Sequence, residues 1–244
     1  MNLCDIRVEY YPFSTIHYPL SLSIIMKILW LFRRLFFSLT QTPVRVWRLA
    51  TFCNHRFYKI YPPSVKLAAA GLLLADLLFF FDFFEILTNL FSPHSRLLTV
   101  IEKERCKEIF GKVIDSELIM VDKRSFPVKK GYAHAYVTFN TINSWRPIRA
   151  DIFVHELTHV WQYQNFGAGY IACALAAQKT AAGYNYTFTE GWYQGSFFDL
   201  NAEQQADFIQ DTYRKRKGFY PQWFSQNPVL NSGVDERFMK ELNT

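Results

Sequence analysis

Residues 149–166 have the sequence RADIFVHELTHVWQYQNF, and the fold of the chain is best approached from this stretch. Its apolar side chains recur at the i, i+4, i+7 and i+8 spacing of one helical face: Phe153, Leu157, Val160 and Trp161. Pro147 stands just before the stretch, where the first turn of a helix accepts proline, and Gly167 follows it. We therefore predict an α-helix from about Pro147 to Asn165.

The same stretch contains the motif H-E-x-x-H, at His155, Glu156 and His159. Residues four apart on a helix are about 40° apart around its axis and one turn apart along it, so the two imidazoles can converge on one metal ion. Glu156 is rotated by about 100° from His155 and flanks that ion. There it can take a proton from a water molecule and return it to a leaving amine. The spacing favours a catalytic zinc site, and chance produces it in on the order of one per cent of chains of this length.

A catalytic zinc site uses three protein ligands and keeps one position open. The segment DLNAEQQADFIQDTYRKR, residues 199–216, is predicted to be a helix and offers Glu203 as the third ligand. Asp207 lies one turn further on the same face, where it can accept the second N–H of a ligating histidine. By itself an E-x-x-x-D pair more often lies on the solvated face of a helix. Its position after the H-E-x-x-H helix favours a role in metal binding instead. Glu190, in a loop flanked by glycines, is the rival third ligand.

Other residue patterns add less. The longer motif H-E-x-x-H-x-x-G-x-x-H is absent, because Gln162 and Asn165 occupy its last two positions. His134 lies on a predicted strand, and a structural role is favoured for it over metal binding. Three tyrosines could stabilise a developing oxyanion or simply pack, and none is assigned: Tyr184, Tyr186 and Tyr193. The four cysteines are far apart without a C-x-x-C pair, which favours free thiols.

The chain changes character near Ser92–Ser95. Beyond this point residues 116–123 and 132–140 alternate as strands do, and residues 97–110, 171–182 and 199–216 have helical patterns. Before it, residues 21–40, 44–58 and 65–90 are predicted to be helical. We therefore expect an α+β fold with a helical N-terminal region, residues 1–92, followed by a domain of residues 93–244.

The net charge of +6 is concentrated near the N-terminus. Residues 1–66 carry nine Lys and Arg against two acids, interleaved with bulky apolar residues as in KILWLFRRLFFSL. Such a pattern fits a membrane-surface or partner-docking helix, or an ordinary cationic face, better than a nucleic-acid interface. We expect no nucleic-acid partner, and we consider contact of residues 26–92 with a membrane surface.

The segment Leu67–Phe91 is long enough to span a bilayer but contains Asp76, Asp82 and Glu85. Each acid at mid-bilayer costs about 2.5–3.5 kcal/mol, so mostly buried helices are expected in place of a span. The first residues do not form a convincing cleavable signal peptide, and Met26 is an alternative start to Met1. The expected location is cytoplasmic or membrane-associated.

The segments HELTHVWQYQ and LNAEQQAD resemble the gluzincin branch of the zincin-like metallopeptidases. The pattern H-E-x-T-H-V-W-Q followed by E-Q-Q-A is similar to small bacterial vgr-related and Rhs-associated zincin-like proteins. The resemblance covers residues 97–216 and leaves residues 1–92 outside.

This resemblance implies a zincin-like domain in which the active-site helix lies under a short twisted sheet and a C-terminal helix carries the third ligand. It implies zinc ligands His155, His159 and Glu203, the general base Glu156, and Asp207 behind the ligands. The expected function is zinc-dependent hydrolysis of a peptide or protein substrate. The alternative is a non-catalytic zincin-like interaction or secretion-accessory module stabilised by zinc.

Overall fold

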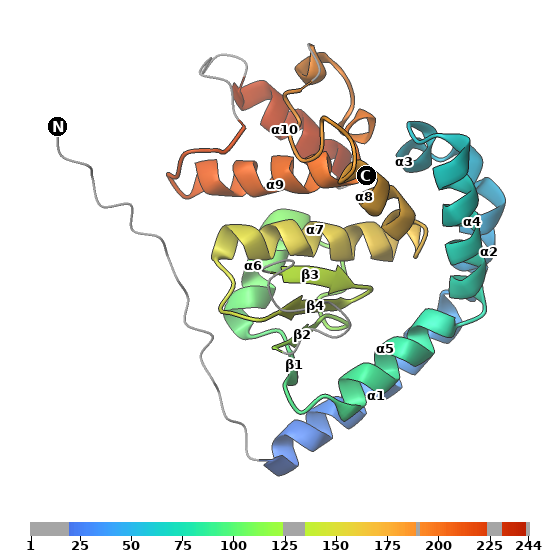
Figure 1. The fold of residues 1–244 in the computed structure, drawn as a ribbon. Coiled ribbons are helices and arrows are strands. Elements are labelled where there is room, and N and C mark those ends of the chain that lie inside the picture. Colours follow the sequence, from blue (N-terminus) through green and yellow to red (C-terminus); the bar gives the residue numbers. More distant parts are fainter. Residues whose placement is uncertain (1–19, 124–134, 189–190, 224–230, 243–244) are drawn as a thin grey trace.

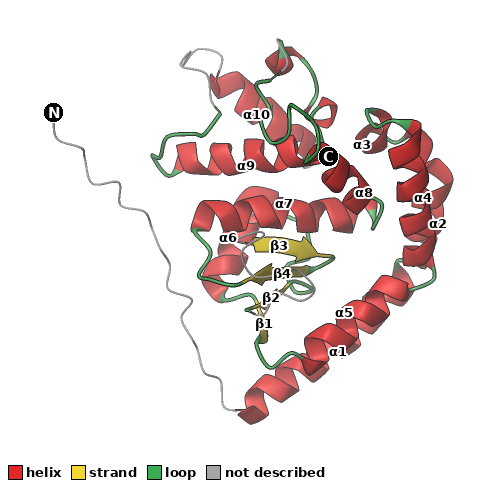
Figure 2. Cartoon of the chain, in the orientation of Figure 1, coloured by secondary structure: helices red, strands yellow, loops and turns green. Residues whose placement is uncertain are grey.

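The chain folds as an α+β protein, as the sequence predicts (Figure 1). The structure is a computed structural model that describes residues 20–123, 135–188, 191–223 and 231–242. Helices predominate, and the short strands form one small sheet (Figure 2).

The residues before 92 form a group of helices that borders one side of the molecule (Figure 1). In chain order these are α1 (Leu20–Thr40), α2 (Thr42–Thr51), the 3-10 turn η1 (Phe52–Asn54), α3 (Arg56–Lys59), α4 (Pro63–Leu77) and α5 (Phe80–Phe91). Helices α1 and α5 lie side by side, and α2 packs on α4.

Two helices predicted in this region are broken. The helix expected over residues 65–90 divides at Phe79, whose φ of 60° is left-handed, and α4 and α5 meet there at 68°. The helix expected over 44–58 ends at Thr51 and continues only as short turns. Hydrophobic periodicity runs through the break at Phe79, because a single left-handed residue changes the direction of a helix without changing which residues are apolar. The break after Thr51 contains no left-handed residue; there the chain becomes extended at His55, whose φ is -70° and ψ 135°.

The sheet has the strand order β1-β2-β4-β3. Its strands are β1 (Ser95–Leu97), β2 (Met120–Asp122), β3 (Ala135–Thr138) and β4 (Thr141–Ser144). Strands β2 and β4 are parallel, whereas β1 and β3 run antiparallel to their neighbours, with Ile142 opposite both Val121 and Val137. The predicted strands over 116–123 and 132–140 are present in part as β2 and β3; residues 132–134, including His134, lie outside the described residues. Strands β1 and β4 were not predicted, because three or four residues are too few to show alternation.

The β3–β4 hairpin turns at Phe139 and Asn140 and is held from outside the sheet. Phe139 has a φ of 59°, a left-handed conformation that costs about 1–2 kcal/mol for a residue with a Cβ. Its ring stacks on Phe81 of α5 at 4.6 Å. The backbone N–H of Asn140 donates to Oε1 of Glu85 at 2.8 Å. Helix α5 therefore holds the turn that the local sequence disfavours.

The remaining helices build the opposite side of the molecule. They are α6 (Val100–Phe110), α7 (Ala150–Phe166), α8 (Tyr170–Ala177), the 3-10 turns η2 (Trp192–Gln194) and η3 (Phe197–Asp199), α9 (Ala202–Arg216) and α10 (Asn231–Leu242). Helix α7 lies between the sheet and α9, its most extensive neighbour (Figure 1). Helix α10 falls in the tail for which no element was predicted.

Capping residues determine where the helices begin and end. Helix α9 begins with a capping box in which Asn201 and Gln204 exchange side-chain and backbone hydrogen bonds. Thr99 and Glu102 do the same for α6, so this helix begins at Val100 and not at the predicted residue 97. Helix α7 begins at Ala150, later than the predicted Pro147, and its last residue is Phe166, where Gly167 stops the helix as predicted. Gly167 has a φ of 75°, and an added Cβ would lie 2.8 Å from Cδ2 of Leu73.

One apolar cluster joins the helices before residue 92 to those after it. Phe57 and Leu73 belong to it, as do Leu157, Phe166 and Phe208. The predicted apolar face of α7 is confirmed, since all four of its members are buried. Helix α7 is therefore held rigidly along its length by the sheet, by α9 and by the N-terminal helices.

Among the described helices none is by itself long and apolar enough to cross a bilayer, whereas α4 and α5 satisfy that test together as a bent pair.

Candidate metal centre

Helices α7 and α9 bring the three predicted ligands together. Oε2 of Glu203 lies 3.5 Å from Nε2 of His155 and 3.3 Å from Nε2 of His159. One donor atom from each of the three residues lies within 4.8 Å of the others. The two histidines come from consecutive turns of α7, and Glu203 comes from the first turn of α9. The distances suit three groups arranged around one cation.

Gln162, in the turn of α7 that follows the motif, determines which nitrogen of His159 faces the centre. Nε2 of Gln162 donates to O of Ala202 at 2.9 Å and to Oε1 of Gln205 at 3.0 Å. Because a backbone carbonyl can only accept, the remaining Oε1 of Gln162 must accept from Nδ1 of His159, 2.8 Å away. With its proton on Nδ1, His159 presents the lone pair of Nε2 to Glu203 and to a metal.

His155 is oriented by a carboxylate. Its Nδ1 lies 2.9 Å from Oδ1 of Asp207. The other oxygen of Asp207 accepts from Nε1 of Trp223 at 2.5 Å, so the carboxylate is held in place. Both histidines therefore direct Nε2 inward and engage Nδ1 elsewhere, which is the arrangement that metal-ligating imidazoles need.

Glu203 has one oxygen satisfied and one left over. Oε1 accepts from Nε2 of Gln178, in the chain segment after α8, at 2.8 Å. Oε2 is buried and forms no hydrogen bond within the described residues. A buried carboxylate oxygen without a donor is costly unless a cation neutralises it. This orphaned oxygen, facing two imidazole lone pairs, fits a zinc ion: the donor set is two nitrogens and one carboxylate.

The electrostatics of the centre also favour a cation. Burial alone would raise the pKa of Glu203, but the two imidazoles hold that pKa well below its usual range. Burial alone would lower the pKa of each imidazole, but Asp207 and Glu203 raise that of His155, and Glu203 raises that of His159. With neutral imidazoles the carboxylates would leave an excess of negative charge, which a divalent cation would offset.

Glu156 differs from the other acids of the centre. It is buried, and it forms no hydrogen bond or ion pair within the described residues. Burial raises its pKa, against the lowering effect of His155 and His159. A buried carboxylate of raised pKa beside the candidate ligands is suited to accept a proton and to return it.

The structure sorts the three candidate tyrosines by position. The ring of Tyr184 lies 6.0 Å from that of His155, and this side chain is partly exposed. Tyr186 is fully buried and donates to Asp211 at 2.9 Å, while the main-chain O of Tyr193 accepts from Arg237. Only Tyr184 of the three therefore lies beside the candidate ligands. The rival ligand Glu190 lies outside the described residues.

Sequence reasoning missed the residues that hold the ligands in place. Gln162, Gln178 and Trp223 come from three different segments and have no common motif. Gln162 carried one usable signal in the sequence, because it stands three residues after His159 and therefore about one turn further on the same predicted helix. Comparison of the chain with protein-family models, with curated proteins and with solved structures gave no match.

Proposed function

We propose that the chain is a zinc-dependent metallopeptidase with a zincin-like arrangement of α7, α9 and the sheet. One observation carries the proposal: Nε2 of His155 and Nε2 of His159 converge on the buried, orphaned Oε2 of Glu203. His155, His159 and Glu203 would hold the ion. When bound, zinc would supply Lewis acidity that polarises a peptide carbonyl and lowers the pKa of water.

The protein's own residues would carry the proton. Glu156 accepts a proton from the attacking water and returns it to the nitrogen of the leaving amine, so one carboxylate serves as base and then as acid. Its raised pKa makes the first transfer more favourable. Asp207 and Gln162 keep both imidazoles in one tautomer, so the ligands need no rearrangement during the reaction.

The sheet offers a place for an extended peptide. Strand β3 stands at the end of the strand order and packs against α7. An edge strand can hydrogen-bond a substrate backbone without reading its side chains. We therefore expect a peptide or protein substrate in extended conformation. Tyr184, whose ring lies 6.0 Å from that of His155, would donate a hydrogen bond to the developing oxyanion.

The alternative is a non-catalytic module that zinc stabilises. It is favoured by the depth of the centre, since His155, His159 and Glu203 are each no more than 9% exposed and structural zinc sites are closed. The two functions differ in whether bound zinc is accompanied by turnover.

Glu156→Gln separates them. We measure zinc content and hydrolysis of a diverse peptide library for the wild type, Glu156→Gln and His159→Ala. A peptidase should show turnover that Glu156→Gln reduces by at least about a thousandfold while zinc stays at one per chain. Zinc in the wild type without turnover would favour the non-catalytic module, and absence of zinc would refute both.

A further inference from the structure

Helix α1 has its polarity reversed relative to a helix of a water-soluble domain. Its buried positions include Arg34 and Ser38, 0% and 3% exposed. Its exposed positions are largely apolar: Ile25, Met26, Ile28, Leu29, Phe32, Leu35, Phe36 and Leu39. In a soluble helix the apolar stripe faces the core and the charges face water. In α1 the side chains that water would solvate are inside, and those that water would exclude are outside.

Helix α5 repeats the reversal beside α1. Its two acids and one amide are buried: Asp82, Glu85 and Asn89. Its exposed residues are all apolar: Phe80, Phe83, Leu87, Leu90 and Phe91. We call these five residues, together with the eight exposed apolar residues of α1, the outer apolar face. Its two helices lie side by side along the border of the molecule (Figure 1).

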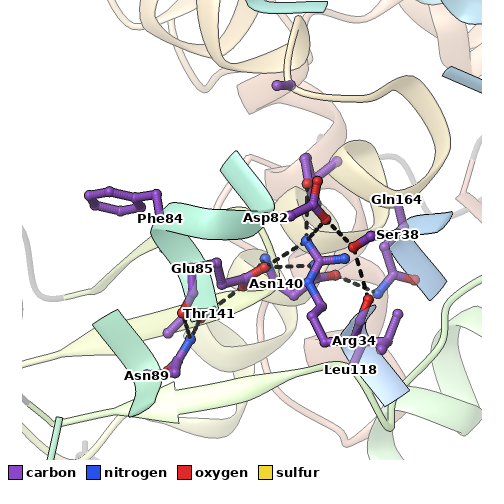
Figure 3. A network of polar contacts seen from close by, with 12 residues as sticks. Arg34, Ser38, Asp82, Phe84, Glu85, Asn89, Leu118, Asn140, Thr141 and Gln164 are labelled. Carbon is purple, nitrogen blue, oxygen red and sulfur yellow. Dashed lines mark hydrogen bonds and ion pairs between the residues drawn. The ribbon is translucent and has the colours of Figure 1, made fainter. Parts of the chain in front are cut away.

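The inward charges neutralise one another, as Figure 3 shows. Nη2 of Arg34 lies 3.0 Å from Oδ1 of Asp82 and 2.9 Å from Oε2 of Glu85. Asp82 also accepts from Arg45 of α2 at 2.5 Å. Glu85 accepts from Asn140 and from Thr141, which tie the pair to the β3–β4 hairpin. Charged residues in lipid-immersed helices behave in this way: they face the protein interior and pair.

The exposed charges of residues 25–91 indicate which kind of surface the outer apolar face contacts. The acids between residues 25 and 91 are Asp76, Asp82 and Glu85, and all three are buried. The exposed charges of that segment are therefore basic, at Arg33, Arg56 and Lys59; Arg33 pairs with Asp115 of the domain, so Arg56 and Lys59 of α3 are the cations left for another surface. The segment therefore combines a broad apolar face with exposed charges that are all positive. This combination complements an anionic lipid surface, because the apolar side chains can enter the acyl boundary while the cations meet the head groups.

The other side of α1 is occupied by the domain itself. Nε1 of Trp30 donates to O of Leu118 at 3.0 Å, and Arg33 pairs with Asp115 at 3.0 Å. Lys27 donates to the main chain of Asn89. With one side fixed to the domain, α1 can present only its outer side to lipid. The geometry suits a helix lying in the membrane surface and not one crossing it.

We propose that the outer apolar face of α1 and α5 inserts into the surface of an anionic lipid bilayer and holds the protein there as a peripheral, monotopic protein. This proposal is independent of the proposed peptidase function, because it uses none of the residues of the metal centre. A second copy of the chain is the competing occupant of the face, and the experiment must separate the two.

The test is flotation of the full-length chain with vesicles of phosphatidylcholine and phosphatidylglycerol, compared with vesicles of phosphatidylcholine alone. The face variant is Phe36→Glu with Phe83→Glu, since these side chains are 70% and 66% exposed. The matched control is Val100→Glu with Tyr220→Glu, which changes the net charge equally at positions 72% and 91% exposed and away from the face. Circular dichroism and thermal melting verify that both variants are folded.

We expect the wild type and the control to float with the anionic vesicles, more weakly with neutral ones, and the face variant to lose at least about tenfold in partition coefficient. Three outcomes would overturn the proposal: a wild type that does not float, equal loss in both variants, or a face variant that dissociates a dimer seen by light scattering but binds vesicles unchanged.

Discussion

Replacing Gln162 by Leu should weaken zinc binding without touching a ligand. The amide is fully buried, and its Oε1 is the acceptor that keeps the proton of His159 on Nδ1. Leucine has nearly the same size but no acceptor, so His159 can shift its proton to Nε2 and compete with the metal. Loss of such an outer partner lowers metal affinity by about 10–100-fold, which corresponds to about 1.4–2.7 kcal/mol.

The same substitution has a separate effect on folding. It leaves two buried acceptors, O of Ala202 and Oε1 of Gln205, without their donor. At about 1–3 kcal/mol for each of the two unsatisfied groups, we expect a loss of about 2–6 kcal/mol in the free energy of unfolding of the metal-free protein. This is a large part of the total stability of an ordinary domain, about 5–15 kcal/mol.

The two effects can be measured independently. Zinc affinity is obtained by competition with a chromogenic chelator at pH 7.5, and stability by urea unfolding in the presence of a chelator. Gln162→Glu is the matched control, because it keeps an acceptor for Nδ1 of His159 while losing the donors to Ala202 and Gln205. We expect it to lose stability but to retain zinc. If Gln162→Leu binds zinc as tightly as the wild type, the assignment of the tautomer is wrong.

Four further predictions rest on the charges of the molecule and on one of its turns. Zinc affinity should reach its maximum above the raised pKa values of His155 and His159, and it should fall at lower pH as the two imidazoles become protonated. A zinc affinity that does not change between pH 5.5 and 8 would contradict this. The folding stability of the metal-free protein should follow the opposite trend. The raised pKa values of the two imidazoles stabilise the folded state at acidic pH, and this stabilisation is lost as the pH rises through those pKa values. Arg34→Met leaves two buried carboxylates short of a partner and should cost about 3–5 kcal/mol in urea unfolding, whereas a cost below about 1 kcal/mol would show that the network is dispensable. Gly167→Ala should lower the melting temperature more than Gly218→Ala, since both glycines are left-handed but only the first has a neighbour within 3 Å of the added Cβ; equal shifts would show that the contact relaxes freely.

Local patterns predicted the site more accurately than the elements around it. The spacing of His155 and His159 is set by helix geometry alone, so their convergence follows once residues 150–166 are helical. The sequence left Glu203 and Glu190 as alternative third ligands. The distances from Glu203 to both imidazoles favour Glu203. Strands β1 and β4 were missed because such short segments have no readable period, and the break at Phe79 was missed because an apolar run gives no sign of a left-handed residue.

The helices before residue 92 show the limit of hydropathy more sharply. We expected the segment Leu67–Phe91 to be mostly buried, yet Phe80, Phe83 and Phe91 are exposed and the acids Asp82 and Glu85 are inside. Hydropathy ranks side chains by their preference for water. It does not say whether an apolar face meets the protein core or another apolar medium, so the direction of each face has to come from the packing.

The sequence alone determined the α+β class, the helix that carries H-E-x-x-H, and the pair of imidazoles one turn apart, because these depend on period and on neighbours within one turn. Only the tertiary structure decided that Glu203 completes the group, that Gln162 and Asp207 orient the imidazoles, and that Arg34 neutralises Asp82 and Glu85 from another helix. Such contacts join residues that lie far apart along the chain, and their formation depends on how whole helices pack, which no local pattern encodes.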